Sequence, residues 1–272
     1  MRVFAVSDLH VDYEPNAQWA KNLSRQDYND DVLILAGDLS DLLDQIGENL
    51  DAFVMRFKKV LYVPGNHEMW ITRSPGFSNS IAKFLEVRRV VRQSGASMEC
   101  MHTDVLTIVP LLGWYDYSFG EPCDELRDAW MDFHACRWPK QMNERQATSF
   151  FAAMNEPLPR PQNTAVISFS HFLPRIDLIP DYVPRNYRYL FPVMGADILE
   201  RQIRQLGASI HVYGHSHLNR RITLDGVTYV NNAFGYPSEV RTTAKRLLCI
   251  YEEGKSSDAD TVFRFDKNAL SP

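Results

Sequence analysis

The sequence predicts an α/β fold with a layered sheet, and three features lead to this prediction. Short apolar, β-branched runs alternate with amphipathic segments through most of the 272 residues. The runs are hydrophobic almost throughout, as strands are when both faces of their sheet are covered. The segments between them carry apolar residues at three- and four-residue spacing, which is typical of helices with one buried stripe. Strands that alternate with helices give an α/β architecture.

Six runs are predicted to be buried strands, because they are short, apolar and rich in β-branched residues. They cover residues 3–6, 32–36, 60–63, 105–109, 165–169 and 210–213. Helices are predicted over residues 42–57, 78–91 and 194–206. The last of these stops before Gly207, a residue type that often caps the C-terminal end of a helix.

The C-terminal part changes character and predicts antiparallel strands. Residues 220–224 and 227–230 flank the pair Asp225-Gly226, which suits a type I′ hairpin turn. Residues 247–251 and 261–265 are predicted to be two further strands. This part therefore completes a sheet that the preceding strand–helix units begin.

The stretch from residue 111 to 189 fits the alternating pattern least well. It is rich in Trp, Tyr, Phe and Pro, and it contains predicted helices at 122–135 and 142–154. We expect residues 113–162 to form a helical cap insertion packed on the same domain. Because the length and composition suit one large α/β domain, residues 1–272 are expected to be a single domain.

Charge and composition narrow the class of protein. The net charge is −5 and no block of five or six like charges occurs, which disfavours binding to nucleic acid or to an anionic membrane. The N-terminus has no signal-peptide pattern, and no apolar run approaches the ~20 residues that span a bilayer. The four cysteines are scattered without metal-site spacing. We therefore expect a cytoplasmic protein without a membrane partner; the sequence does not indicate its oligomeric state.

Polar clusters stand directly after five of the predicted strands. They are Asp8 with His10, Gly37-Asp38, Gly65-Asn66-His67-Glu68, His171, and Gly214-His215-Ser216-His217. Ligands of open α/β sheets bind beyond the carboxyl ends of the strands, so these clusters are expected to converge. His and Asp suit first-row divalent metal ions, whereas the absence of Cys from these five clusters disfavours a structural zinc site. Each cluster alone is weak evidence; the ordered set of five predicts a metal site.

In this order the five motifs resemble those of the calcineurin-like metallophosphoesterases, from residue 8 to residue 217. The resemblance implies a two-sheet β-sandwich flanked by helices, with α/β/β/α layers. It also implies two divalent metal ions per chain, manganese or iron or both, with zinc as the remaining candidate.

Carried over by position, the resemblance assigns seven metal ligands. Asp8, His10, Asp38 and His217 hold one ion, while Asp38 bridges to a second ion that Asn66, His171 and His215 also hold. His67 faces the leaving group of the substrate as the catalytic residue. Two cations ~3.5–4 Å apart stabilise both the attacking and the leaving oxygen of a phosphoryl transfer and generate hydroxide near neutral pH.

Within this family the sequence points away from the Ser/Thr protein phosphatases. Their Gly-Asp continues as Val-Asp-Arg-Gly, whereas this chain reads Gly37-Asp38-Leu39-Ser40-Asp41 and resembles the bacterial-type phosphodiesterase branch. We expect hydrolysis of a small phosphodiester or phosphomonoester. The alternative is a non-catalytic metal-binding scaffold or protein-interaction module, which an exposed aromatic patch at residues 114–138 would favour. An amidohydrolase is disfavoured, because eight even strand–helix repeats are missing.

Several conspicuous residues receive no functional role at this point. His102, His134 and His211 match no motif position. Trp70, three residues after His67, is expected to pack in the core, and a stacking surface over the pocket is the alternative. The residues that bind the substrate cannot be named from the sequence.

Overall fold

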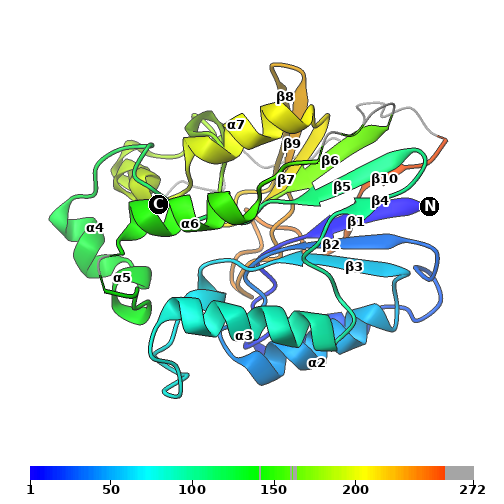
Figure 1. Cartoon of the computed structure of the whole chain (residues 1–272), viewed down its shortest axis with the longest axis horizontal. Helices are drawn as coiled ribbons and strands as arrows, with labels where there is room; N and C mark the ends of the chain where they lie inside the picture. The colour runs from blue at the N-terminus through cyan, green and yellow to red at the C-terminus, as the bar shows by residue number, and fades with distance from the viewer. Residues whose placement is uncertain (141, 160, 162–163, 255–272) are drawn as a thin grey trace.

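Two β-sheets pack face to face and helices cover their outer faces (Figure 1). The computed structural model describes residues 1–140, 142–159, 161 and 164–254. One sheet has the strand order β10-β1-β2-β3, and the other has the order β4-β5-β6-β7-β9-β8. This arrangement confirms the layered α/β/β/α sandwich.

Apart from β4, which the sequence pattern did not predict, the described strands lie close to their predicted bounds. They are β1 Arg2–Val6, β2 Val32–Ala36, β3 Lys59–Val63, β4 Met101–His102, β5 Leu106–Pro110, β6 Ala165–Phe169, β7 Ile210–Tyr213, β8 Arg220–Leu224, β9 Val227–Asn231 and β10 Leu248–Glu252. Strands β1, β2 and β3 run parallel, as do β5, β6, β7 and β9, so their carboxyl ends share an edge within each sheet. The strand predicted at residues 261–265 lies outside the described residues.

The helices are α1 Glu14–Lys21, α2 Leu43–Val54, α3 Ser80–Gln93, α4 Asp124–Ala129, α5 Asp132–Ala135, α6 Glu144–Met154 and α7 Asp197–Leu206. Three 3₁₀ segments are η1 His67–Met69, η2 Ile176–Leu178 and η3 Arg185–Val193. The sequence pattern did not predict α1 or η3. Gly207 ends α7 in the left-handed conformation, with φ 65°, as its position predicted.

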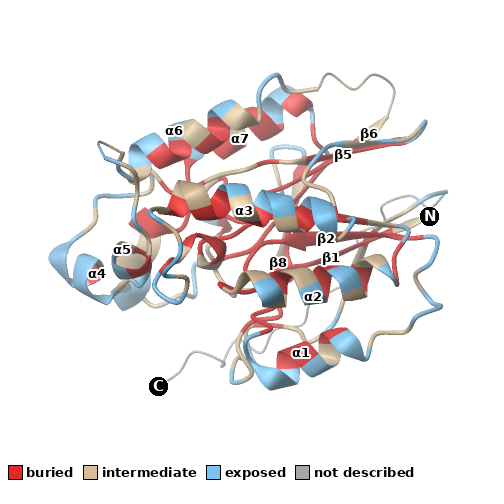
Figure 2. Cartoon of the chain, turned by 60° about the horizontal axis from the view of Figure 1, so that its bottom comes forward, coloured by how far each residue is buried: buried red, intermediate tan, exposed pale blue. Residues whose placement is uncertain are grey.

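The inner strands, such as β2, are apolar on both faces because each face packs against a different layer (Figure 2). In β2, Val32 and Ile34 face the other sheet and join a cluster that includes Ile167. Leu33 and Leu35 join a second cluster that contains residues of α2. Continuous hydrophobicity in the sequence therefore reports burial between a sheet and a helical layer.

The hairpin at the end of the second sheet has the predicted turn. Asp225 and Gly226 have φ values of 49° and 83°, as a type I′ turn requires, and they join β8 to β9. All four cysteines are free. Within the described residues, no helix combines the length and the hydrophobicity needed to cross a membrane.

The segment between β5 and β6 corrects one prediction. A single helix over residues 122–135 was wrong, because the chain forms α4 and α5 with an extended residue, Trp130, at their junction (φ −81°, ψ 118°). The break turns the Trp130 indole toward Asp132, to which its Nε1–H donates a hydrogen bond of 2.8 Å. Trp130 and Asp132 are two residues apart, and their contact accompanies the break between the two helices.

Candidate metal centre

The five polar clusters converge at the carboxyl-end edge of the two sheets, as predicted. Titratable side chains there form three overlapping groups whose ligand atoms lie within 4.8 Å of one another. The groups are Asp8, His10 and His217; His10, Asp38 and His67; and Asp38, His171 and His215. Asp38 and His10 each belong to two groups, so the three form one continuous centre. Asn66 joins it through its Oδ1, which lies 3.1 Å from His171 Nε2.

The backbone reaches this centre in an unusual conformation. Asp8, His10, Asp38, His215 and His217 all have positive φ, between 43° and 69°. For residues other than glycine this region costs about 1–3 kcal/mol each and persists only where the surroundings impose it. These residues thus converge through left-handed turns just beyond the strands.

His171 and His215 face each other with their unprotonated nitrogens. His171 Nδ1 lies 2.9 Å from the Ala36 carbonyl, and His215 Nε2 lies 3.0 Å from the Val193 carbonyl. Since a carbonyl oxygen only accepts, each of these nitrogens carries a proton, and in that neutral tautomer the other ring nitrogen is free. The remaining nitrogens, His171 Nε2 and His215 Nδ1, therefore present lone pairs to each other at 3.1 Å. A cation between them satisfies both, which is what a metal site requires.

The side chains around His217 also form a group that suits a cation. His217 Nε2 lies 3.2 Å from both Asp8 Oδ1 and His10 Nε2. Burial opposes protonation, but the Asp8 and Glu239 carboxylates raise the pKa of His217 to about 10. Buried His10 Nδ1 has no hydrogen-bond partner among the described residues. Without a metal, a proton on His217 balances the carboxylates; a bound cation takes its place.

Acidic side chains gather around Asp38. Burial, followed by the nearby charges of Glu68 and Asp8, raises the pKa of the Asp38 carboxyl well above its usual value. Glu68 is fully buried and accepts backbone hydrogen bonds from Gly65 (2.6 Å), Asp38 (3.2 Å) and Leu39 (2.7 Å). It thereby joins the β2 and β3 loops, a role that the sequence did not reveal. The donor set of His, Asp and Asn around this charge fits divalent metal ions.

Gly65 shows how tightly the centre is packed. A Cβ at this position would stand 2.1 Å from Asp38 Oδ1 and 2.8 Å from His171 Cε1. Only glycine therefore allows the β3 loop to approach the two side chains.

His67 lies at the margin of the centre, where a substrate can reach it. Its Nε2 lies 3.7 Å from Asp38 Oδ2, and its backbone N–H donates to Asp38 Oδ1 at 3.1 Å. Burial and the neighbouring His10 ring lower the pKa of His67 well below its usual value, so the ring is neutral near pH 7.

Trp70 does not have the role expected from the sequence. Its ring stacks on His67 with centroids 3.7 Å apart, and its Nε1–H donates to Asp132 at 2.6 Å. The expectation of simple core packing was wrong, because the buried carboxylate of Asp132 holds the indole beside the centre. No local pattern in the sequence signals this contact across 62 residues.

The family model of the calcineurin-like phosphoesterases matches residues 1–219 of the chain. The chain belongs to this family. It is therefore a phosphoesterase, a hydrolase of phosphate esters, and its family uses a divalent metal centre. The expectations of fold, family and enzyme class are confirmed.

This phosphoesterase is similar to named relatives. Acyl-carrier-protein phosphodiesterase PptH of Mycobacterium tuberculosis is 29% identical over 266 residues, covering 88% of this chain and 79% of the relative. The crystal structure of the phosphopantetheinyl hydrolase PptH from the same organism has a TM-score of 0.72 at 25% identity, with 95% of this chain and 98% of that chain covered. TT1561 of Thermus thermophilus has a TM-score of 0.49 at 13% identity, over 85% and 89% of the two chains.

A cavity of about 390 Å³ opens on the centre of this phosphoesterase. Its floor includes Asp38, Asn66 and His67. Its apolar wall includes Trp130, Ile179, Val183, Leu190, Phe191 and Met194. Most of this wall comes from η3 and the residues before it, which the sequence pattern did not identify as an element. The aromatic and Pro-rich composition of residues 180–192 was the signal that could have marked it.

Two further residues of the cavity also escaped the sequence analysis. The Tyr236 ring packs against His10, with centroids 4.5 Å apart, and Glu239 contacts His217. Both lie beyond residue 217, where the recognised motifs end.

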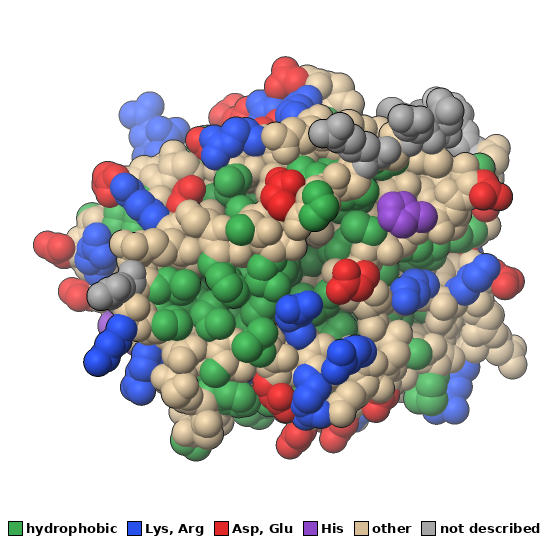
Figure 3. Space-filling model, viewed as in Figure 1, with side chains coloured by type: hydrophobic (Ala, Val, Ile, Leu, Met, Phe, Trp, Pro, Cys, Tyr) green, Lys and Arg blue, Asp and Glu red, His purple; other side chains and the backbone are tan. Residues whose placement is uncertain are grey.

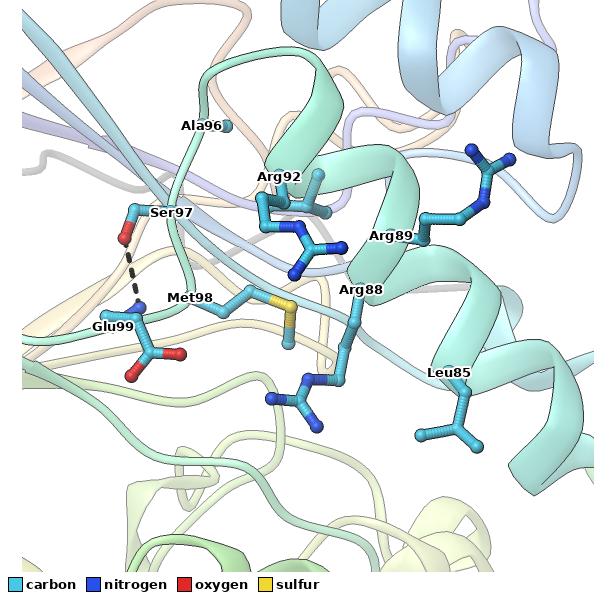
Figure 4. Close-up of a pocket in the computed structure, with 9 residues that line it drawn as sticks. Leu85, Arg88, Arg89, Arg92, Ala96, Ser97, Met98 and Glu99 are labelled. Carbon is cyan, nitrogen blue, oxygen red and sulfur yellow. Dashed lines mark hydrogen bonds between the residues drawn. The ribbon is translucent and has the colours of Figure 1, made fainter.

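A second cavity, of about 350 Å³, lies beside the C-terminal half of α3. Leu85, Arg88, Arg92, Met98 and Glu99 are among its lining residues (Figure 4). Figure 3 shows that apolar side chains gather on the face that carries α3, with charged side chains around them. The cavity contains none of the residues of the metal centre.

The non-catalytic alternative loses its structural support. The aromatic run that would have formed an exposed patch is largely internal, since Trp114 and Tyr115 are each 1% exposed. His102 and His134 are exposed away from the three ligand groups, and His211 is buried between Ser168 and Ser170.

Proposed function

We propose that this phosphoesterase cleaves the phosphodiester that joins a phosphopantetheinyl arm to an acyl carrier protein. The observation that carries the proposal is the cavity, whose apolar wall leads directly to Asp38, Asn66 and His67. A pantetheinyl arm is long and largely uncharged, so an apolar wall beside a phosphate-reacting centre suits it. The similarity to PptH, named for this substrate class, supports the same assignment.

We further propose the ligand assignment that the motif positions predict. Asp8, His10, Asp38 and His217 hold one divalent ion, and Asp38, Asn66, His171 and His215 hold the second. When bound, such a pair supplies Lewis acidity and a hydroxide nucleophile near neutral pH. The absence of Cys and the mixture of oxygen and nitrogen donors favour manganese or iron, with zinc as the remaining candidate.

The chain's own residues orient the reacting groups. The carbonyls of Ala36 and Val193 fix the tautomers of His171 and His215, so that each ring keeps a free nitrogen toward the centre. His67 is the catalytic residue in this proposal, and as a neutral imidazole it donates a hydrogen bond to the departing oxygen. The stacked Trp70 ring restricts His67 to one orientation.

The remaining part of the proposal concerns the cap. Residues 113–162 contribute Trp130 to the cavity wall, and we infer that the cap restricts access to ligands that fit beside this indole.

The test uses purified holo-acyl carrier protein as substrate and Mn²⁺ as the metal. Mass spectrometry of the carrier protein should show loss of the phosphopantetheinyl arm with the wild-type enzyme and no loss with Asp38→Ala. Hydrolysis of bis-p-nitrophenyl phosphate and p-nitrophenyl phosphate is measured in parallel. Cleavage of the small diester without release of the arm would refute the substrate assignment and leave the phosphodiesterase class intact. Preference for the monoester would redirect the proposal to a phosphatase.

A further inference from the structure

Asp132 is a buried carboxylate of the cap that receives hydrogen bonds from three side chains of the site. It lies at the start of α5, is 2% exposed, and accepts from Asn66 Nδ2 at 2.9 Å. It also accepts from Trp70 Nε1 at 2.6 Å and from Trp130 Nε1 at 2.8 Å, and the Tyr115 side chain is a further donor. No Lys, Arg or His among the described residues pairs with it. A buried charge without a counter-ion is costly, so these donors are what makes the carboxylate tolerable there.

The contact with Asn66 determines which end of the amide faces the metal centre. A carboxylate only accepts hydrogen bonds, so it binds the NH₂ end of the amide. The Oδ1 end is then left 3.1 Å from His171 Nε2, within the centre. If the amide turned over, its NH₂ group would face the metals and could not bind a cation. The acceptor-only chemistry of Asp132 therefore selects the rotamer that can act as a ligand.

The side chains of Trp70 and Trp130 connect Asp132 to two further parts of the site. Trp70 is stacked on His67, and Trp130 lines the cavity. Trp130 also packs edge-on against His215, with ring centroids 5.7 Å apart. Asp132 thus contacts the proposed ligand Asn66, the Trp70 ring that stacks on His67, and Trp130 of the cavity wall.

We propose that Asp132 is a positioning residue that links the cap to the metal centre, by fixing the Asn66 amide with its oxygen toward the metals and by anchoring Trp70 and Trp130. The inference rests on the proposed function, because it assumes that Asn66 is a ligand. It adds a determinant outside the five motifs, in the segment that the family resemblance does not assign.

The first test is Asp132→Asn, which keeps the shape and removes the acceptor-only character. An NH₂ group then opposes at least one of the donors, so Asn66 loses its fixed orientation. We expect the Mn²⁺ affinity of the metal-free protein to fall by about 10–100-fold, as second-sphere substitutions commonly cause. Calorimetric titration with Mn²⁺ measures this loss without relying on turnover.

Kinetics at limiting and at saturating Mn²⁺ separate the effect of Asp132→Asn on metal binding from its effect on the cavity. At limiting Mn²⁺, Asp132→Asn should lower kcat, and saturating Mn²⁺ should restore most of it. The KM for the diester should stay raised at both concentrations, because the Trp130 anchor is lost regardless of metal occupancy. General unfolding would not produce this recovery.

Asp31→Asn is the matched control. Asp31 is also a buried carboxylate, 4% exposed, but it pairs with Arg2 at the opposite end of the sheets from the ligand turns. This variant should lose stability and keep its Mn²⁺ affinity within about twofold of the wild type. Asp132→Ser offers a second disruption of the same contact if Asp132→Asn does not fold, with the same expected loss of affinity.

The outcomes distinguish this inference from the proposed function. Wild-type Mn²⁺ affinity and kcat in both Asp132 variants would overturn the inference. Equal weakening in Asp132→Asn and Asp31→Asn would also overturn it, because the effect would then be general destabilisation. If the wild-type protein itself binds no metal and cleaves no diester, the proposed function fails, and with it the assumption about Asn66.

Discussion

His217 Nδ1 lies 2.6 Å from the Glu239 carboxylate, and this contact turns the other ring nitrogen toward Asp8. Glu239 also accepts the backbone N–H of Tyr236 at 2.7 Å, so one side chain supports both a proposed ligand and the wall behind it. Carboxylates in this position fix the ring orientation of metal-binding histidines and raise their basicity. The residue lies beyond the 1–219 match to the family.

Replacement of Glu239 should therefore weaken metal binding without removing any proposed ligand. We expect Glu239→Ala to lower Mn²⁺ affinity by about 10–100-fold, since His217 loses the acceptor that fixes its tautomer. Titration of the metal-free protein measures the change. Glu86→Ala, which removes a surface carboxylate paired with Arg89, is the control and should bind Mn²⁺ like the wild type. An unchanged affinity in Glu239→Ala would show that His217 needs no support.

Loss of His67 should separate catalysis from metal binding. His67→Ala removes the imidazole that faces the leaving group, and we expect kcat to fall by about 10²–10⁴-fold. Metal content, measured by elemental analysis, should stay near the wild-type value. His102→Ala, at an exposed histidine, serves as the control and should keep full activity. Loss of metal in His67→Ala would make His67 a ligand and not a catalytic group.

Asp38→Ala should lose metal and activity together. Its carboxylate lies 3.5 Å from His171 Nε2 and shares ligand groups with His10 and His215. Without a bridging carboxylate, both ions lose a charged ligand, so we expect less than one metal per chain after dialysis. Two retained metals per chain would show that the bridging assignment is wrong.

A change in the apolar wall of the cavity should alter the KM for the carrier-protein diester more than the KM for a small diester. Phe191→Ala removes an aromatic side chain from the wall, and we expect the KM for holo-acyl carrier protein to rise roughly tenfold, which corresponds to about 1.4 kcal/mol. The KM for bis-p-nitrophenyl phosphate should change much less. Leu85→Ala, in the second cavity, is the control and should leave both values unchanged. Equal effects of Phe191→Ala on both substrates would exclude a site for the arm at this wall.

His211 makes stability depend on pH independently of the metal centre. Burial lowers its pKa to about 3, whereas the unfolded chain titrates near the ordinary value of 6.5. Between these values the unfolded state binds more protons, so this contribution is complete above pH 6.5 and is lost as the pH falls toward 3. Lowering the pH from 7 to 5 should therefore cost about 2 kcal/mol through this residue.

Denaturant unfolding at the two pH values, compared between the wild type and His211→Gln, isolates that contribution. The variant lacks the titrating ring, so its pH-dependent loss of stability should be smaller by about 2 kcal/mol. Identical losses in both proteins would show that His211 can be protonated in the folded state.

The sequence predicted the parts of the molecule that depend on local periodicity. Strands such as β2 and β6 have their predicted bounds, because a strand that is covered on both faces must be apolar throughout. The motif residues converge because parallel strands bring their carboxyl ends to a shared edge. The assignment of individual ligands and the division of the chain into one domain with a cap at residues 113–162 remain predictions.

The parts that the sequence could not predict depend on contacts between distant segments. Trp70 reaches Asp132 across 62 residues, and no repeat or spacing encodes that contact. Glu239 supports His217 from 22 residues away, in a stretch without a recognised motif. Leu190 and Phe191 of η3 line a cavity that distant segments form together, and no local pattern encodes that arrangement.

Five residues of the centre have a left-handed backbone that lowers stability, and their side chains are the ones that the proposed activity needs. They are Asp8, His10, Asp38, His215 and His217. Glycine adopts that conformation without steric cost, so replacing any one of them by glycine would relieve local strain while removing a side chain that the chemistry needs. A library selected only for heat resistance should therefore accumulate glycine or asparagine there and lose turnover. Engineering a more durable form of this enzyme should leave these five turns unaltered and seek stabilising changes elsewhere.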